Sequence, residues 1–383
     1  MQQASTTGDI AKLKVLHFIY DSPQNPWVGG GGSVRVRELY TRLKHRVDVT
    51  VVTGNFPGAQ NETIDSIRYL RLGARKPYWW SRLTYARAAN VLSRRGSYDA
   101  AVFDFSGYTP IFLPRNRPAG ITIHHLSSPT ASKRWGRVLS RGLGSLERGM
   151  IRRAGRISAT SESARQAANE IAPGIPVDMV SAGVPPGLFQ ITRRPQNFLL
   201  YFGRLDVFHK GIDTLLEAIA ILAKRRPGVE LRIAGRGAAD RISALVEKSQ
   251  LGSNVRVLGA VSDAERDELF STAAIQIMPS RFEGFGLAAA EAMAAGVPLI
   301  ATNVGSLPEV VDPPRGGRLV PASDPAALAT AIENLLADAN ARERLSESAR
   351  ASARRFDWDT VAEAHLRFLR NIAMGPASGS VAT

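Results

Sequence analysis

The stretch Arg281-Phe-Glu-Gly-Phe-Gly-Leu287, which continues to Gly296, determines how the rest of the chain is interpreted. It follows the apolar run 275–279, typical of the end of a strand, and it leads into 288–295, a run of strong helix formers. Gly296 stands where a helix-terminating glycine belongs, and Pro298 prevents the helix from continuing. The stretch therefore predicts a strand, a tight glycine turn and a short helix.

A turn of this kind can hold an anion. It directs free backbone N–H groups and the positive end of a helix dipole towards one point. Glu283 lies in the turn, and Glu291 lies about one turn into the predicted helix. An anion cradle flanked by two carboxylates suits a ligand that carries both phosphates and sugar hydroxyl groups.

Length and composition indicate a globular protein. A chain of 383 residues favours two domains, and its apolar content of 44% is sufficient for a sizeable core. No apolar run approaches the roughly 20 residues that a membrane span needs, and residues 1–9 lack the apolar core of a signal peptide. The absence of cysteine excludes disulfides, thiolate metal sites and a cysteine nucleophile. We expect a cytoplasmic location, although a protein without cysteine is also compatible with export.

The net charge of +15 is distributed unevenly along the chain. Residues 1–190 contain 26 basic and 12 acidic side chains, a balance of +14, which leaves +1 for the remainder. This asymmetry predicts an anionic partner for the first half: a membrane surface, an acidic acceptor or nucleic acid. A genome that favours arginine is the alternative, but such a bias would affect both halves.

Two segments of the first half suit a membrane surface. Trp79 and Trp80 stand beside basic residues, as side chains at a membrane interface do, and they are equally compatible with a core position at the start of a helix. Residues 133–156 predict a basic amphipathic helix, which suits either an anionic membrane or an ordinary solvated surface. Both pairs of interpretations remain open.

The first half begins with a strand, a glycine loop, a helix and a second strand, over 13–19, 21–32, 33–44 and 47–52. The loop lacks the G-x-G-x-x-G spacing of a dinucleotide fingerprint, but its position before a helix favours close approach of the backbone to a ligand. Further strands are expected over 67–72, 99–104, 120–124 and 156–160. His124 and His125 end one of these strands at the carboxyl edge, where sites of α/β proteins lie.

After a linker candidate, the Pro- and Gly-rich stretch 173–195, the pattern of strand, turn and helix restarts. It predicts a second parallel-sheet domain, with strands over 197–202, 230–234, 255–258, 275–279 and 297–301. Arg204 and Lys210 flank the loop after the first of these strands. A planar guanidinium and a compact ammonium can together neutralise a diphosphate, and a structural salt bridge is the alternative.

These motifs resemble the retaining GT-B glycosyltransferases of family 4. The similarity covers nearly the whole chain and is strongest in the second half, where Glu283 and Glu291 show the family's Glu-x7-Glu spacing. The other matching positions are Gly203-Arg204, Lys210-Gly211, 234–237, Gly305 and Glu309, and in the first half and at the end Pro26, Gly31-Gly32, His124, Ser161, 180–184 and 356–358. The loop at 29–32 has four glycines where the family usually shows two.

The resemblance implies an α/β protein of the GT-B fold, with two Rossmann-like parallel-sheet domains facing a cleft. Residues 12–188 would form the acceptor-binding domain and residues 196–355 the domain that binds a nucleotide diphosphate sugar. A C-terminal helix over 356–373 would pack back on the N-terminal domain, and 374–383 would be a disordered tail.

The resemblance also implies roles for individual residues. Catalytic roles would fall to Arg204 and Lys210, which stabilise the diphosphate leaving group, to Glu283 on the sugar hydroxyls, and to His124 against the donor sugar. Glu291 would hold the ribose hydroxyls. The other donor-binding positions would be Gly284, Phe285, Gly286, Leu287, Gly31, Gly32, Gly235, Gly237, Gly259 and Val261. No DxD-type metal motif stands out, so we expect no cofactor and no essential metal beyond the nucleotide sugar itself.

The sequence thus predicts a retaining glycosyltransferase that uses a nucleotide sugar donor. Because the basic excess lies in the acceptor half, we expect an anionic or lipid-linked glycan acceptor of cell-surface polysaccharide or glycolipid synthesis. The enzyme would then sit peripherally on the inner face of the plasma membrane, with no nucleic acid partner. Two alternatives remain: a soluble enzyme that modifies a small natural product, and a non-catalytic nucleic-acid-binding protein on the same fold.

Overall fold

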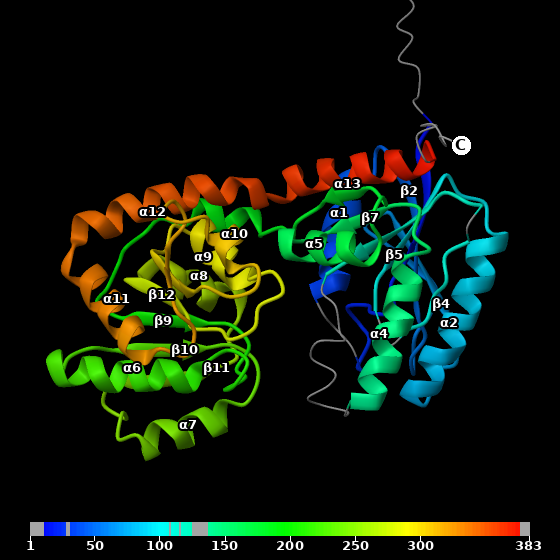
Figure 1. The fold of residues 1–383 in the computed structure, drawn as a ribbon. Helices are drawn as coiled ribbons and strands as arrows, with labels where there is room; N and C mark the ends of the chain where they lie inside the picture. The colour runs from blue at the N-terminus through cyan, green and yellow to red at the C-terminus, as the bar shows by residue number, and fades with distance from the viewer. Residues whose placement is uncertain (1–10, 28–30, 107–108, 115, 125–136, 376–383) are drawn as a thin grey trace, which may run out of the picture. The chain divides into compact units, whose positions relative to one another are not determined.

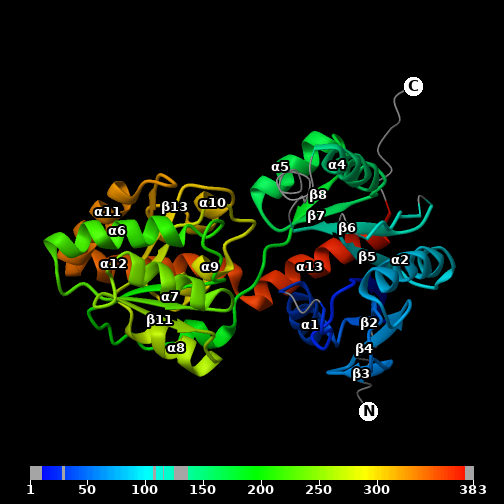
Figure 2. The same ribbon diagram turned by 90° about the horizontal axis from the view of Figure 1, so that it is seen from below.

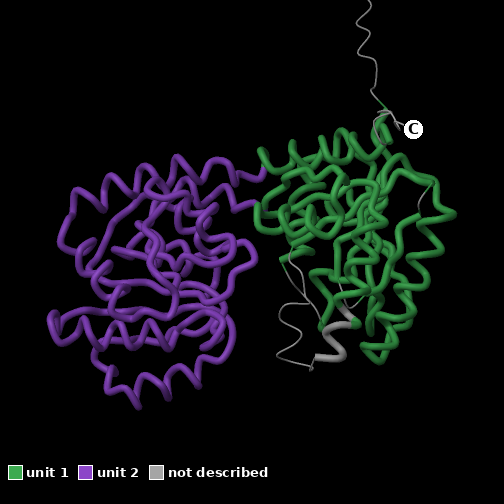
Figure 3. The backbone as a smooth tube through the Cα atoms, viewed as in Figure 1, with its two compact units in different colours: residues 1–181, 359–383 green, residues 182–358 purple. Residues whose placement is uncertain are grey.

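The computed structural model describes residues 11–27, 31–106, 109–114, 116–124 and 137–375. The chain forms two compact units, one of residues 1–181 with 359–383 and one of residues 182–358 (Figure 3). Several expected features lie outside the described residues: His125, Gly29 and Gly30 of the 29–32 glycine run, the start of the basic helix at 133–136, and the tail beyond 375.

Unit 1 is built on an eight-stranded sheet of order β3-β4-β2-β1-β5-β6-β7-β8, and Figure 2 labels most of these strands across the sheet. All neighbouring strands pair in parallel except the hairpin of β3 and β4. The strands are β1 (Leu13–Phe18), β2 (Val47–Gly54), β3 (Glu62–Ile64), β4 (Ile67–Leu72), β5 (Ala100–Asp104), β6 (Ala119–Ile123), β7 (Ile157–Ala159) and β8 (Val177–Met179). The strand order changes direction between β1 and β5, which makes the carboxyl edge at that point the expected position of a site.

Helices cover both faces of this sheet (Figures 1 and 2). One core cluster joins the sheet to α2 (Tyr78–Arg95), α4 (Arg137–Ile151) and α5 (Glu162–Ile171). The helices α1 (Gly31–Leu43) and α13 (Trp358–Ala373) lie together, because Tyr40 of α1 and His365 of α13 share a hydrogen bond of 3.2 Å. Ion pairs of Arg42 with Asp359 and of Arg46 with Glu363 add to this contact, so the C-terminal helix is part of unit 1.

Unit 2 is a six-stranded parallel sheet of order β11-β10-β9-β12-β13-β14. Its strands are β9 (Leu199–Phe202), β10 (Leu231–Ala234), β11 (Val255–Gly259), β12 (Ile275–Met278), β13 (Leu299–Thr302) and β14 (Arg318–Val320). The strand order reverses between β9 and β12. This is the doubly wound arrangement, in which ligands bind beyond the carboxyl ends of the strands at the reversal point.

Alternating side chains of the unit 2 strands form two core clusters, one on each face of the sheet. Leu199 and Tyr201 belong to the cluster of α6 (Ile212–Arg225), α7 (Ala239–Lys248) and α11 (Pro325–Ala337). Leu200 belongs to the cluster of α8 (Asp263–Thr272), α9 (Leu287–Ala294), α10 (Leu307–Val311) and α12 (Ala339–Ala353). A strand buried on both faces is expected to be a continuous apolar run, which is why these strands were recognisable in the sequence. The short 3-10 helices η1 (Pro186–Gln190) and η2 (Arg354–Phe356) complete the unit.

The expected fold class, two Rossmann-like parallel sheets, is confirmed, with local differences. The stretch 173–195 is not a linker throughout, because it contains β8, an edge strand of the first sheet. The hairpin of β3 and β4 was not expected. Its turn places Asp65 and Ser66 in the left-handed region, with φ of 54° and 67°, so no glycine marks it in the sequence.

Candidate functional site

The loops after β9 and β12 meet at the reversal point of the unit 2 sheet. Lys210, at the end of the first loop, donates a hydrogen bond of 2.6 Å from Nζ to Oε2 of Glu283 in the second loop. The side chains are only 15% and 11% exposed, so the pair is well shielded from solvent. Ser280 Oγ also donates to Glu283 Oε2, at 3.3 Å. The structure thus brings together two of the four predicted catalytic residues, 73 positions apart in the sequence.

Arg281 ties these two loops to each other. Its guanidinium donates to Asp213 Oδ1 and Thr214 Oγ1 at the start of α6, both at 2.7 Å, and its backbone N–H donates to the His209 carbonyl at 2.9 Å. Because both loops are fastened in this way, Lys210 and Glu283 are held together without any ligand. Sequence reasoning assigned no role to Arg281, because its partners lie about 70 residues away.

Glu291 lies on α9, one turn beyond the glycine turn. Gly286 is the N-cap of this helix with φ of 90°, a left-handed conformation that glycine adopts without strain. Burial raises the pKa of Glu291 to about 7, Arg266 opposes this shift, and Asp263 and Asp267 add to it. The carboxyl group is thus partly protonated near neutral pH, and a partner that donates hydrogen bonds to the carboxylate would favour its ionised form.

The backbone itself requires glycine at several of the positions that are predicted to contact the donor. Gly235 and Gly237 have φ of 143° and 139°, and a Cβ on Gly235 would lie 1.8 Å from the Gly203 carbonyl oxygen. Gly235 N–H donates to the carbonyl of Gly259, whose φ is 71°, at 2.7 Å. These glycines therefore let three loops pack closely, and their contact with a donor stays a prediction.

The remaining predicted donor-site residues of unit 2 follow Glu283 and β11. Gly284 lies in the turn, and Phe285 packs edge-on against Phe356 with ring centroids 5.5 Å apart. Leu287 is exposed, and Val261 packs partly buried against the α9 core cluster.

Arg204 differs from Lys210 in its surroundings. Its side chain is 67% exposed, and the carboxylate of Asp206 lies 3.9 Å from its Nη2. The structure therefore does not place the Arg204 guanidinium against Glu283. A solvated arginine in this loop has the freedom to turn towards an anionic ligand, at the cost of side-chain entropy.

A second polar cluster lies at the reversal point of the unit 1 sheet. Asp104, at the end of β5, contacts two imidazoles: Oδ1 lies 3.2 Å from His17 Nε2, and Oδ2 lies 3.2 Å from His124 Nε2. A Cβ on Gly32 would lie 3.8 Å from Asp104 Oδ2, whereas Gly31 has open space around it. His124 and Gly32, both predicted site residues, therefore meet at Asp104.

Sequence reasoning missed Asp104 and His17. Burial raises the pKa of Asp104, but the charges of His124 and His17 and their hydrogen bonds outweigh burial and hold it well below its usual value. The sequence signal was available, because Asp104 ends the expected strand 99–104 at the same edge as His124. His17 gave no such signal, since its position inside a buried strand is typical of a structural histidine.

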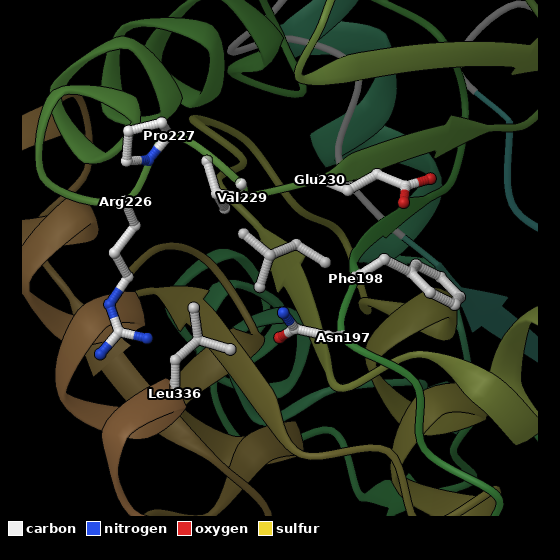
Figure 4. Close-up of a pocket in the computed structure, with 9 residues that line it drawn as sticks. Asn197, Phe198, Arg226, Pro227, Val229, Glu230 and Leu336 are labelled. Atoms are coloured by element: carbon white, nitrogen blue, oxygen red, sulfur yellow. The ribbon is translucent and has the colours of Figure 1, made fainter.

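A cavity elsewhere on unit 2 is distinct from these clusters. It has a volume of about 200 Å³ and is lined by residues that precede β9 and β10, among them Asn197, Arg226 and Glu230 (Figure 4). It therefore lies at the amino edge of the sheet, opposite the loops that carry Lys210 and Glu283, and it contains none of the predicted site residues.

The described residues contain no group of three or more His, Asp or Glu side chains arranged to hold a metal ion. Within the same part of the chain, no helix is both long and apolar enough to cross a bilayer.

Comparison with known protein families divides the chain as its motifs do. Residues 29–187 match the model of Glycosyltransferase Family 4, and residues 189–352 match that of Glycosyl transferases group 1. Among curated proteins, the phosphatidyl-myo-inositol mannosyltransferase of Mycobacterium leprae is 34% identical over 218 residues, 56% of each chain. The D-inositol 3-phosphate glycosyltransferase of Paenarthrobacter aurescens is 36% identical over 188 residues, 48% of this chain and 46% of its own. The matched segments thus span about half the length of these relatives.

Solved structures share the fold over most of the chain. A sucrose-phosphate synthase from Thermosynechococcus elongatus matches with a TM-score of 0.76 and 23% identity, over 94% of this chain and 98% of its own. The Anabaena protein HepE in complex with UDP and glucose matches with a TM-score of 0.72 and 17% identity, over 94% and 99%. These neighbours confirm the GT-B architecture expected from the sequence.

Proposed function

We propose that this chain, a group 1, family 4-like glycosyltransferase of the GT-B fold, transfers a sugar from a nucleotide diphosphate sugar to a glycan acceptor with retention of configuration. The observation that carries the proposal is the Lys210–Glu283 pair at the reversal point of the unit 2 sheet, beside the turn that leads to Glu291. The cation and the helix N-terminus there suit the diphosphate of a nucleotide sugar. The two carboxylates suit the hydroxyl groups of its sugar and its ribose.

The proposed chemistry uses the charges of these residues. When the glycosyl–phosphate bond breaks, its electron pair goes to the phosphate oxygen, and fixed cations stabilise the charge as it develops. Lys210 is already in place, and the exposed Arg204 can close on the diphosphate as it binds. Glu283 accepts hydrogen bonds from the sugar hydroxyls, and its charge tolerates the oxocarbenium character of the transferred sugar. The proposal uses no metal ion in any step.

Retention follows in this proposal from attack on the front face of the sugar. The acceptor oxygen forms its bond to the anomeric carbon on the side that the phosphate leaves. The acceptor proton passes to the departing phosphate oxygen, and a nucleoside diphosphate is released. Nuclear magnetic resonance of the product tests this directly, because an inverted anomeric configuration would contradict it.

A thermal-shift screen tests the donor. UDP, GDP, ADP and their sugars would be added to the full chain, and one nucleotide family is expected to raise the melting temperature. A ligand present at 100 times its Kd adds about 2.7 kcal/mol of apparent stability. The selected donor should then give radiolabelled sugar transfer or slow hydrolysis. A protein that responds to no sugar nucleotide would contradict the proposal.

We further propose that the acceptor is lipid-linked or anionic and is met at an anionic membrane surface, through the exposed face of α2. Trp79 and Trp80 are each 56% exposed at the start of this helix, so the core interpretation of the two tryptophans is wrong. Leu83 and Val91 continue the exposed apolar face. The sequence of α2 contains no acidic residue, and its exposed basic residues with those before it are Arg75, Lys76, Arg87, Arg94 and Arg95. Apolar side chains among cations suit the interface of an anionic membrane.

Vesicle co-sedimentation tests this surface. The protein is expected to bind vesicles of anionic lipid at low salt and to bind neutral vesicles much more weakly. Replacing both tryptophans (Trp79→Ser with Trp80→Ser) should weaken binding about 100-fold, since each large apolar side chain that leaves the interface costs roughly 1.5 kcal/mol or more. Met179→Ser, an exposed apolar position of the same unit outside α2, is the matched control. Equally weak binding to anionic and neutral vesicles, as expected of a soluble enzyme that modifies small natural products, would contradict the membrane proposal.

A further inference from the structure

A chain of hydrogen bonds runs through the interior of unit 1 and ends at His124. It starts on the C-terminal helix α13, where His365 Nε2 lies 3.2 Å from Tyr40 Oη, and it continues from Tyr40 Oη to His17 Nδ1 at 2.8 Å. His17 Nε2 meets Asp104 Oδ1, and Asp104 Oδ2 meets His124 Nε2, both at 3.2 Å. His17, Tyr40 and His365 are fully buried, whereas His124 is partly exposed. Five side chains from separate segments thus connect the core of the unit to one predicted catalytic residue.

Arg35 is a second buried charged group in this interior. Its side chain is 3% exposed, and it donates from Nη2 to the Val180 carbonyl at 3.1 Å. Asp104 is the charged group that most favours the protonated guanidinium, against the cost of its burial. Burial, followed by the charges of Arg35 and His17, lowers the pKa of His365 well below its usual value, so this imidazole is neutral.

The charge of Asp104 determines the direction of its two hydrogen bonds. An ionised carboxylate only accepts, so His124 and His17 both carry a proton on Nε2. The opposite arrangement would set a lone pair of either Nε2 against a carboxylate oxygen, which is repulsive.

We infer that Asp104 is a positioning residue that holds His124 in its Nε2–H tautomer and so presents Nδ1 as a hydrogen-bond acceptor to a hydroxyl of the transferred sugar. The role at the sugar rests on the proposed function, whereas the tautomer rests on the geometry of unit 1 alone. His17 holds the other carboxylate oxygen, so Asp104 is held at both of its oxygens. Neither Asp104 nor the rest of the chain needs to touch the substrate.

The tautomer is measurable without turnover. The full chain would be labelled with 15N-histidine, and long-range proton–nitrogen spectra would identify which ring nitrogen of each imidazole carries the proton, with His124→Gln assigning that signal. We expect His124 and His17 to be Nε2–H tautomers, each with an Nε2–H proton protected from exchange with water. A His124 protonated on Nδ1, or on both nitrogens at pH 8, overturns the inference even if no variant folds.

Asp104→Asn tests whether Asp104 determines the tautomer of His124. An asparagine side chain has one acceptor oxygen, so it can serve one imidazole, and the two protected Nε2–H signals should fall to one. Where the His124 signal is the one lost, kcat/KM should fall by about 10- to 100-fold, the effect of losing a hydrogen bond to a charged group. Two retained signals, or lost activity with the His124 signal intact, would overturn the positioning role.

Tyr40→Phe is the matched control, because it interrupts the chain beyond His17 and leaves the contact of Asp104 with His124 in place. It should lower the melting temperature, keep the His124 signal and change kcat/KM by less than about threefold. A loss of activity as large as that of Asp104→Asn would indicate a general structural role instead. If the protein transfers no sugar at all, the proposed function fails while the spectra still decide the tautomer.

Discussion

Replacing Lys210 by alanine is expected to lower kcat by about 100- to 1000-fold, the effect of removing one preorganised group from a developing negative charge. The ammonium is held 2.6 Å from Glu283 by loops that are already fastened, so it needs no rearrangement when the diphosphate begins to leave. Steady-state kinetics with the donor found in the thermal-shift screen measure the effect. Lys224→Ala, an exposed lysine on α6 of the same unit, is the control and should leave kcat unchanged.

The same substitution leaves a shielded carboxylate without its cation, so a loss of stability must be separated from the loss of catalysis. Lys210→Ala should destabilise the protein by about 1–3 kcal/mol, because Glu283 becomes a poorly solvated, unpaired charge. The double variant Lys210→Met with Glu283→Gln removes both charges and should recover most of this stability, as neutral replacements of shielded ion pairs often do. Its kcat should stay low. Recovery of kcat together with the melting temperature would show that the pair is structural.

The local patterns of unit 2 were sufficient to predict its strands and its glycine turn. Leu200 and its neighbours form apolar runs because the strands are buried on both faces, and Gly286 is required where α9 begins from a left-handed residue. Such features depend on a few adjacent residues. The meeting of Lys210 with Glu283 depends instead on the strand order, in which β9 is the neighbour of β12. Two charged residues in separate loops suggested a shared ligand, but no local pattern shows that they pair with each other.

Most of the polar chain of unit 1 was beyond prediction for the same reason, although the position of Asp104 at the end of the expected strand 99–104 offered a signal. Its members lie at positions 17, 40, 104, 124 and 365, and each alone is compatible with an ordinary core or surface residue. The last member, His365, comes from α13, which follows unit 2 in the sequence but belongs to unit 1. Only the folded chain brings these side chains within hydrogen-bonding distance, so the sequence identified His124 but not the carboxylate beside it.

Glu291→Gln is expected to stabilise the ligand-free protein at pH 8 and to have little effect at pH 5. Burial raises the pKa of Glu291 from its ordinary value of 4.5 to about 7 in the folded chain. Between these values the folded state holds a proton that the unfolded state has released. The stability that this group contributes is therefore fully present below pH 4.5 and is lost as the pH rises to 7, by up to about 3 kcal/mol. Glutamine resembles the protonated acid at every pH, so denaturation curves of the two proteins should diverge as the pH rises.

Donor binding should reverse this preference, because ribose hydroxyls donate to a carboxylate and favour its ionised form. Binding at pH 7 should therefore release a fraction of a proton, which calorimetry detects as a difference in apparent enthalpy between buffers of unlike ionisation enthalpy. Donor affinity of the wild type should rise from pH 6 to pH 8, whereas Glu291→Gln should bind about 10- to 100-fold more weakly at pH 8, without this dependence. If the variant keeps the proton release of the wild type, another group carries the titration and Glu291 does not hold the ribose. If proton release disappears while affinity is unchanged, Glu291 titrates near the ligand without binding it, and the acidic acceptor of the glycine turn is Glu283 alone.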